Sequence, residues 1–354
     1  MKSRARELGV PFEGNPGAHN AITDVAGVLV GQTTLVRGRD VRTGVTVVLP
    51  RGKRYDPVFA GWHAFNGNGE MTGTTWVEES GFLETPIAIT NTHSVGVTRD
   101  AVVDWMSQNG LYDPLHPGIY WLNPVVAETY DGTLNDINGF HVRAGDVQAA
   151  LDSASSGPVA EGNTGGGTGM ICHGFKGGTG TASRRLSDEE GGTSVGVLVQ
   201  ANHGGRPALT IAGCPVGREL ASQGIEDNGE TGSIIVVVAT DAPLLPHQLK
   251  RLARRVPLGI GRVGGIGGNT SGDIFIVFST ANPGAADRSR TVELRMLPND
   301  ALDPLFNAVI QATEEAILNA LAAAETMTGR NGNTVPALPH AQVRAILKKY
   351  HRLT

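Results

Sequence analysis

Ser271 stands in a setting that suits a nucleophile. A glycine-rich loop from Gly264 to Asp273 surrounds it, and the apolar run from Ile274 to Ser279 follows directly. This layout predicts a buried strand with Ser271 at its first residue. Glycines leave space beside the hydroxyl group and permit strained backbone, so two reactions fit: attack on a substrate carbonyl, or attack on the chain's own Thr270–Ser271 bond. A tight glycine turn before a core strand is the structural alternative.

Two other predicted strand ends carry polar side chains that suit a substrate pocket. Glu128 and Tyr130 follow the apolar start of the segment from Trp121, and a carboxylate beside a tyrosine can hold a substrate ammonium group. Asn202 ends the apolar run that begins at Val195, and an amide N–H there can donate to an oxyanion. A solvated strand end at Glu128 and a turn at Asn202 are the respective alternatives.

A long helix is predicted to begin at Asp303, where an N-cap residue precedes a proline. Its apolar stripe at helical spacing consists of Leu302, Phe306, Val309, Ala316, Ile317 and Ala320. Thr313 falls near the middle of this stripe, so its hydroxyl group either bonds back to the helix or faces a site. Glu314 and Glu315 flank the stripe on opposite sides, because one residue turns a helix by about 100°. Only one of the two can lean toward the same pocket as Thr313.

Short apolar runs separated by glycine-rich loops position these residues. Strands are predicted at residues 27–30, 45–49, 86–93 and 233–240. A helix is predicted at about 244–255, followed by a loop over 259–268 that leads to Ser271. Residues 61–70 and 162–180 are predicted as loops, and the second allows backbone to approach the site or a neighbouring subunit.

Composition and charge exclude several classes of function. The chain of 354 residues has 49 glycines, about double the usual share, and a net charge of −5 with both signs interspersed, so we expect neither nucleic-acid binding nor membrane anchoring. Cys172 and Cys214 are too few for a disulfide framework and lack a metal-binding spacing, which favours free thiols. The charged start of the chain lacks a signal-peptide pattern, so a cytoplasmic location is expected. The ten histidines lack ligand spacing, so no metal and no cofactor are expected.

Taken together, these motifs resemble the family of L-aminopeptidase/D-amidase-esterases and β-peptidyl aminopeptidases. These are self-processing serine peptidases whose layout is similar to that of N-terminal-nucleophile hydrolases, with different strand connectivity. The resemblance covers nearly the whole chain and is carried by the segments Arg4–Gly9, Asn20–Val25, Val126–Gly132, Gln200–Asn202, Gly272–Phe275 and Thr313–Ile317. It implies one domain over residues 1–354 with an α/β fold, an αββα four-layer sandwich in which two packed sheets are flanked by helices.

The resemblance also implies roles for individual residues. The precursor would cut its Thr270–Ser271 bond and divide into an α subunit, residues 1–270, and a β subunit, residues 271–354. Ser271 would then attack the substrate carbonyl and form an acyl-enzyme, with Asn202 binding the oxyanion.

Glu128 would bind the substrate's ammonium group, and Tyr130 would line that subsite. The family's supporting hydroxyl and carboxylate map onto Thr313 and Glu315, whereas a shift of one residue would give Ala312 and Glu314. Thr270 departs from the Gly or Asn that often precedes the nucleophile. The resemblance further implies a homotetramer of processed units and no cofactor.

Three alternatives stay open from the sequence. An N-acyltransferase of the ornithine acetyltransferase type would also self-cleave, but such proteins use Thr where this chain has Ser271. A glycine-rich nucleotide-binding or structural protein would leave the chain intact. The preferred substrate also stays open among L-amino acid amides, D-amino acid esters and β-peptides, because it depends on the shape of the pocket.

Overall fold

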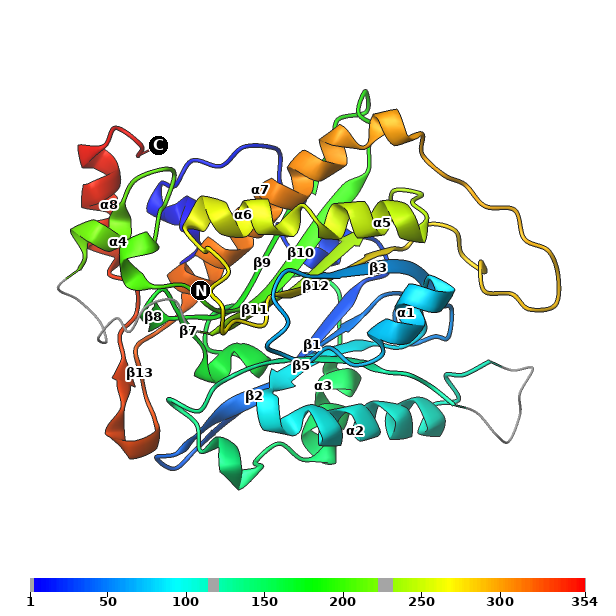
Figure 1. Cartoon of the computed structure of the whole chain (residues 1–354), viewed down its shortest axis with the longest axis horizontal. Helices are drawn as coiled ribbons and strands as arrows, with labels where there is room; N and C mark the ends of the chain where they lie inside the picture. The colour runs from blue at the N-terminus through cyan, green and yellow to red at the C-terminus, as the bar shows by residue number, and fades with distance from the viewer. Residues whose placement is uncertain (1–2, 114–120, 222–231, 354) are drawn as a thin grey trace.

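Two β-sheets packed face to face form the centre of the molecule (Figure 1). The structure is a computed structural model, and it describes residues 3–113, 121–221 and 232–353. In spatial order the larger sheet comprises β4 (Phe82–Leu83), β3 (Val58–Ala64), β12 (Ile274–Ser279), β11 (Ser233–Thr240), β10 (Ser194–Asn202) and β9 (Gly178–Arg185). The smaller sheet comprises β1 (Leu29–Arg37), β2 (Val41–Leu49), β5 (Ile87–Asn91) and β6 (Val125–Thr129). Both sheets are mixed, because β11–β12 and β5–β6 pair parallel and the other neighbours pair antiparallel.

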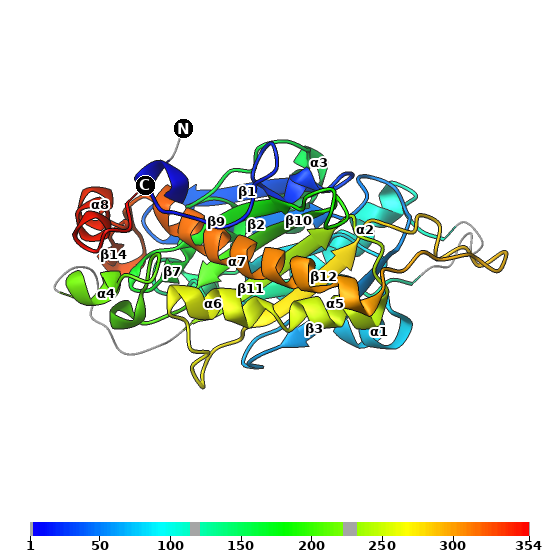
Figure 2. The ribbon, with the colours of Figure 1, turned by 90° about the horizontal axis from the view of Figure 1, so that it is seen from above.

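Helices cover the outer face of each sheet. On the larger sheet lie α5 (Pro246–Ala253), α6 (Val256–Val263) and α7 (Asp303–Ala323), which Figure 2 shows side by side above the strands. On the smaller sheet lie α2 (Val95–Gln108) and α3 (Ala144–Ser153). The order helix, sheet, sheet, helix confirms the predicted αββα four-layer sandwich.

Short elements complete the described chain. The helices are α1 (Thr74–Ser80), α4 (Val216–Glu219) and α8 (His340–Lys349), and two small hairpins pair β7 (Ile171–Cys172) with β8 (Phe175–Lys176) and β13 (Met327–Thr328) with β14 (Thr334–Val335). Among the described residues, no helix is long and apolar enough to cross a membrane.

Strand β11 shows why the central strands are apolar on both faces. Its side chains alternate, with Ile235, Val237 and Ala239 packing between the two sheets and Ile234, Val236 and Val238 packing toward the helices. Every residue of β11 is buried. The continuous apolar run therefore predicted a strand covered on both sides, and the predicted bounds, 233–240, are confirmed.

Two strands extend further than their apolar cores. Strand β1 runs nine residues and pairs with β2 from Leu29 opposite Leu49 to Arg37 opposite Val41. The predictions of 27–30 and 45–49 stopped where polar residues such as Thr33 and Arg42 begin. Those residues belong to the half-exposed end of the hairpin, where pairing continues although one face is no longer buried.

The predicted loop over 259–268 is partly wrong, because α6 continues to Val263. Gly259 explains the error. A Cβ atom at this position would lie 2.7 Å from Ile310 O and 2.7 Å from Thr313 Cβ, so the glycine allows α6 to pack closely on α7. The glycine marks a helix crossing and not a turn.

Several strands end at the same edge of the sandwich. In the larger sheet, Asn202 at the end of β10 pairs with Ser233, and Ile274 at the start of β12 pairs with Ala64 at the end of β3. Gln200 Nε2 donates to Thr90 O at 2.9 Å, which joins β10 to the end of β5 in the other sheet. The polar residues that follow these strands are therefore brought together across both sheets.

Candidate active site

Ser271 is buried at this edge, three residues before β12 and not at its first residue as predicted. Its Oγ accepts from Asn66 Nδ2 at 2.9 Å and lies 2.9 Å from Gly268 O and 3.0 Å from Asp273 Oδ2. Its amide nitrogen donates to Gly268 O at 2.9 Å. The hydroxyl group is therefore held by a tight turn and by a carboxylate, an arrangement that suits activation of a nucleophile.

The sequence analysis predicted residues 61–70 as a loop, which is partly wrong because β3 continues to Ala64. It missed the contacts that the turn after β3 makes with the loop of Ser271. Besides the bond from Asn66 to Ser271, Asn68 Nδ2 donates to Thr270 O at 2.8 Å. Gly69 lies between Glu128 and the backbone beside Ser271: a Cβ on Gly69 would be 3.1 Å from Gly272 Cα and 3.2 Å from Glu128 Oε1. The available signal was two asparagines in a glycine turn at a strand end.

Glu128 is buried near the end of β6, on the other side of Gly69 from Gly272. Its Oε1 accepts from Glu70 N at 3.1 Å, and its Oε2 accepts from the hydroxyl group of Thr92. Burial raises the pKa of this carboxyl group, although both hydrogen bonds oppose the shift. Each oxygen keeps a lone pair for a further donor, so the carboxylate can hold a cation close to Ser271.

Ser233 connects Asn202 to the residue after Ser271. Asn202 pairs with Ser233, whose Oγ accepts from Gly272 N at 2.9 Å. Its Oδ1 accepts from Ile171 N at 2.8 Å and its Nδ2 donates to Tyr130 O at 3.0 Å, which fixes the amide with its nitrogen toward the smaller sheet. The side chain of Tyr130 is half exposed, and its hydroxyl group turns back over Gly132.

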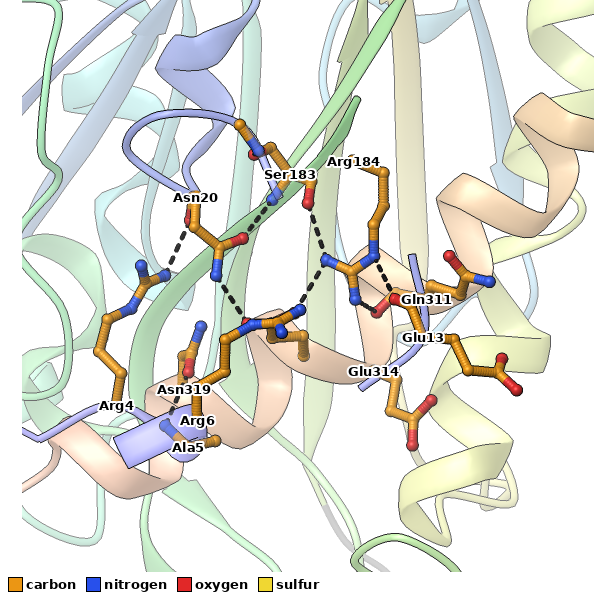
Figure 3. Close-up of polar contacts among 12 residues, drawn as sticks. Arg4, Ala5, Arg6, Glu13, Asn20, Ser183, Arg184, Gln311, Glu314 and Asn319 are labelled. Atoms are coloured by element: carbon orange, nitrogen blue, oxygen red, sulfur yellow. Dashed lines mark hydrogen bonds and ion pairs between the residues drawn. The ribbon is translucent and has the colours of Figure 1, made fainter. Parts of the chain in front are cut away.

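Thr313 and Glu315 have different surroundings. Glu315 is fully buried and accepts from Arg6 Nε at 2.7 Å and from Asn20 Nδ2 at 2.6 Å, with Arg184 Nη1 at 2.8 Å. Figure 3 shows Arg6, Asn20 and Arg184 converging beside α7. Thr313 is also buried and packs on Gly259 of α6, and its hydroxyl has no hydrogen-bond partner in the described part of the chain. These contacts do not connect either residue to Ser271.

Comparison with known proteins identifies the family of the chain. The pattern of peptidase family S58 matches residues 20–335, which is most of the chain. The chain belongs to peptidase family S58. The resemblance inferred from the sequence motifs is thereby confirmed, and this S58 peptidase is an aminopeptidase of the serine type.

Relatives match this S58 peptidase over nearly their whole length. The chain is 56% identical to "Beta-peptidyl aminopeptidase BapA" of Sphingosinicella microcystinivorans, over 99% of this chain and 93% of that protein. It superposes on the L-aminopeptidase D-Ala-esterase/amidase of Ochrobactrum anthropi with a TM-score of 0.93, 51% identity and complete coverage of both chains. That structure is described as a variant of the Ntn hydrolase fold. A β-aminopeptidase from Burkholderia sp. gives a TM-score of 0.91 at 50% identity, over 98% of this chain and 99% of its own. None of these relatives supports the acyltransferase alternative.

A buried cluster of Cys172, His173 and His203 lies next to Asn202 in this S58 peptidase. The donor atoms of the three side chains lie within 4.8 Å of one another, with Cys172 Sγ 3.8 Å from His203 Nδ1. Burial lowers the pKa of His203 well below its usual value, and the nearby His173 adds to the shift. The sequence shows no ligand spacing here, because Cys172 and His203 are 31 positions apart and meet only where β7 and β10 end. Both cysteines are free thiols, as predicted.

A cavity of about 570 Å³ lies at the opposite end of the sandwich from Ser271. It is lined by Tyr55, Trp76, Phe82, Tyr112 and Trp121 among others, and Phe82 pairs with Phe59, which lies opposite the last residue of β12. Because Ser271 precedes the first residue of β12, this cavity does not contain Ser271.

Proposed function

We propose that this S58 peptidase matures by cutting its own Thr270–Ser271 bond, which divides the single domain into an α subunit, residues 1–270, and a β subunit, residues 271–354. The observation that carries the proposal is the buried hydroxyl group of Ser271, which lies between the carboxylate of Asp273 and the amide of Asn66, on the residue that contributes the nitrogen of the bond. Cleavage would make Ser271 the first residue of its subunit and give its hydroxyl group a neighbouring free amine.

In the mature enzyme, Ser271 Oγ attacks the carbonyl of the substrate's first residue and forms an ester. The amine product leaves, and water then releases the amino acid. Asn202 donates to the oxyanion, a role supported by its place beside Ser233 and Gly272. Glu128 holds the substrate ammonium, supported by its burial across Gly69 from the nucleophile loop, and Tyr130 lines that subsite. An ammonium site this close to the nucleophile makes the enzyme release residues from the amino end.

We propose short peptides, amides and esters with a free amino group as substrates, β-amino acid peptides included. Support comes from the names of the relatives, which describe β-peptidyl aminopeptidase, L-aminopeptidase and D-Ala esterase or amidase activities. A buried carboxylate favours a positively charged group on the substrate, and this attraction acts on an amino group of either the α or the β carbon.

We also propose a homotetramer of processed units and a cytoplasmic location. Residues 281–298 form an extended arm without helix or strand that leaves the body of the molecule, and it exposes Leu294 and Met296 (Figures 1 and 2). An arm with exposed apolar side chains suits contact with another copy. The two free buried thiols suit a reducing compartment.

Intact mass under denaturing conditions tests the proposal, with Ser271→Ala as the variant and the exposed Ser187→Ala as the matched control. We expect wild type and control to split into residues 1–270 and 271–354, and the Ser271 variant to stay whole and inactive on amino-acid p-nitroanilides. An intact wild-type chain that releases no p-nitroaniline would exclude Ser271 as the nucleophile.

A further inference from the structure

We propose that Asp273 is the proton acceptor that starts the self-cleavage, and that Asn68 binds the oxygen of the bond being cut. The inference rests on the self-cleavage proposed above and assigns residues to that step, separate from those that bind a substrate. It follows from the contacts of the uncleaved chain around Thr270 and Ser271.

The contacts of Ser271 Oγ identify the acceptor. The oxygen receives one hydrogen bond, from Asn66 Nδ2 at 2.9 Å, so its single proton points to one of two oxygens. One is the carbonyl of Gly268 at 2.9 Å and the other is Asp273 Oδ2 at 3.0 Å. A backbone carbonyl is not basic enough to remove the proton, whereas a carboxylate can accept it.

The uncleaved chain needs such an acceptor because the backbone nitrogen of Ser271 cannot act as the base. In enzymes with an N-terminal nucleophile, the free amine acts as the base. Before cleavage, the nitrogen of Ser271 is an amide that donates to Gly268 O at 2.9 Å and carries no basic lone pair. The carboxylate of Asp273 is the basic group that the structure places within hydrogen-bonding distance of the hydroxyl.

The carbonyl oxygen of Thr270, on the bond to be cut, also has a hydrogen-bond donor. Asn68 Nδ2 donates to Thr270 O at 2.8 Å, within the distance expected for a group that stabilises a developing oxyanion. Asn66 and Asn68 come from the same turn, so one segment orients the nucleophile and polarises the carbonyl that it attacks.

Backbone bonds hold this turn against the nucleophile loop. Phe65 N donates to Asp273 O at 2.9 Å, Asp273 N donates to Asn66 O at 3.1 Å, and Asn68 N donates to Ser271 O at 3.2 Å. Asp273 Oδ1 accepts from Ile234 N at 3.2 Å, which turns Oδ2 toward the hydroxyl group. The reacting groups are therefore positioned before any bond changes.

The reaction balances with one water. Asp273 Oδ2 takes the hydroxyl proton as Ser271 Oγ bonds to the carbonyl carbon of Thr270, and charge moves to the carbonyl oxygen beside Asn68 Nδ2. The C–N bond then breaks, and the proton passes from Asp273 to the departing nitrogen, which leaves an ester and a free amine. Water adds to the ester and expels the side-chain oxygen, so Thr270 gains a carboxyl group and Ser271 regains its hydroxyl.

Pulse–chase cell-free translation of the full chain tests the inference, with cleavage followed by gel electrophoresis. The variants are Asp273→Asn and Asn68→Ala, and the matched control is Asp100→Asn, whose side chain is 75% exposed on α2. We expect cleavage to slow by about 100-fold or more in Asp273→Asn and by about 100- to 1000-fold in Asn68→Ala. The control should cleave at the wild-type rate.

Thermal unfolding compared with that of the uncleaved Ser271→Ala chain shows whether each variant is folded. If Asp273→Asn does not fold, the cleavage rate of Asn68→Ala tests the inference. Asn68 is exposed, so we expect its replacement to leave the fold intact. Folded variants that both cleave as fast as wild type would overturn the inference and leave the proposed function standing. A wild-type chain that never cleaves would overturn both.

Discussion

Replacing Glu315 by Gln separates a structural role from the catalytic role that the family resemblance implies. The carboxylate is fully buried between Arg6, Arg184 and Asn20. Gln keeps the shape and one acceptor oxygen but removes the charge. We expect the variant to lose stability and, when folded, to keep its rate of turnover.

The expected loss follows from the burial of Arg184. Its side chain is 2% exposed and lies 2.8 Å from Glu315, so neutralising the carboxylate leaves a guanidinium group in the interior without its opposite charge. Breaking a buried ion pair in this way costs about 3–5 kcal/mol. Burial by itself raises the pKa of Glu315, but the bonds and charges of Arg6, Arg184 and Asn20 outweigh it and the pKa is lowered.

That pKa direction gives a second signature. A carboxyl group with a lowered pKa in the folded state stabilises the fold above its unfolded pKa, near 4.5, and loses this contribution as pH falls through the folded pKa. The difference in stability between wild type and Glu315→Gln should therefore be full at pH 7 and shrink below pH 4.5.

Urea unfolding of uncleaved Ser271→Ala chains measures the effect on a single polypeptide. Glu314→Gln is the matched control, because Glu314 pairs at 3.0 Å with Arg262, whose side chain is 43% exposed. Such a pair contributes about 0–1 kcal/mol. The reasoning would be refuted if Glu315→Gln unfolded at the same urea concentration as its parent. A large fall in kcat in the cleavable Glu315→Gln enzyme, at unchanged stability, would instead favour the catalytic assignment.

Three further outcomes are expected. Glu128→Gln should raise KM for amides, because the ionised carboxylate binds the substrate ammonium group. In the wild type, kcat/KM should fall as the pH decreases, and the fall should begin at a higher pH than for an ordinary glutamate, because burial raises the pKa of Glu128. The pH profile of the variant should lack this fall. Asn202→Ala should lower kcat by about 100- to 1000-fold in steady-state assays of the cleaved enzyme, since an oxyanion donor is lost; an unchanged kcat would remove Asn202 from the reaction. Gly259→Ala should destabilise the fold by about 1–3 kcal/mol in urea unfolding, because its Cβ would press on Thr313 and Ile310, whereas Gly261→Ala, where a Cβ meets open space, serves as the control.

The hydrophobic pattern predicted single buried elements well because burial on both faces gives a continuous apolar run, whereas the four-layer sandwich was implied by the family resemblance. The apolar run of β11 and the helix from Asp303 both follow from hydrophobic pattern and capping residues alone. Glycine was harder to interpret, since Gly259 sits inside a helix at a close crossing while Gly268 accepts hydrogen bonds in the nucleophile loop. Only the neighbours of each glycine distinguish the two cases.

The sequence analysis singled out Ser271 and Glu128 as candidates, and their catalytic roles stay predictions, but it did not find the groups around Ser271. Asn66 and Asn68 lie some 200 positions earlier in the chain, and Asp273 was quoted only as part of a motif. Spacing along the chain carries no information about such pairs, because β3 and β12 become neighbours only when the sheet forms. For the same reason Thr313 and Glu315 of α7 were assigned by motif, although Glu315 contacts the N-terminal segment and Thr313 packs on Gly259 of α6.

Strand β12, the first strand after the proposed cut, lies in the middle of the larger sheet between β3 and β11. A severed molecule could not release either piece without exposing the inside of the sandwich, so the two polypeptides would stay interlocked although nothing covalent joins them. Folding, in contrast, would have used one continuous chain. A cut molecule would therefore have folded before it was cut. After full denaturation, refolding would require two separate fragments to associate, so its rate would depend on their concentration.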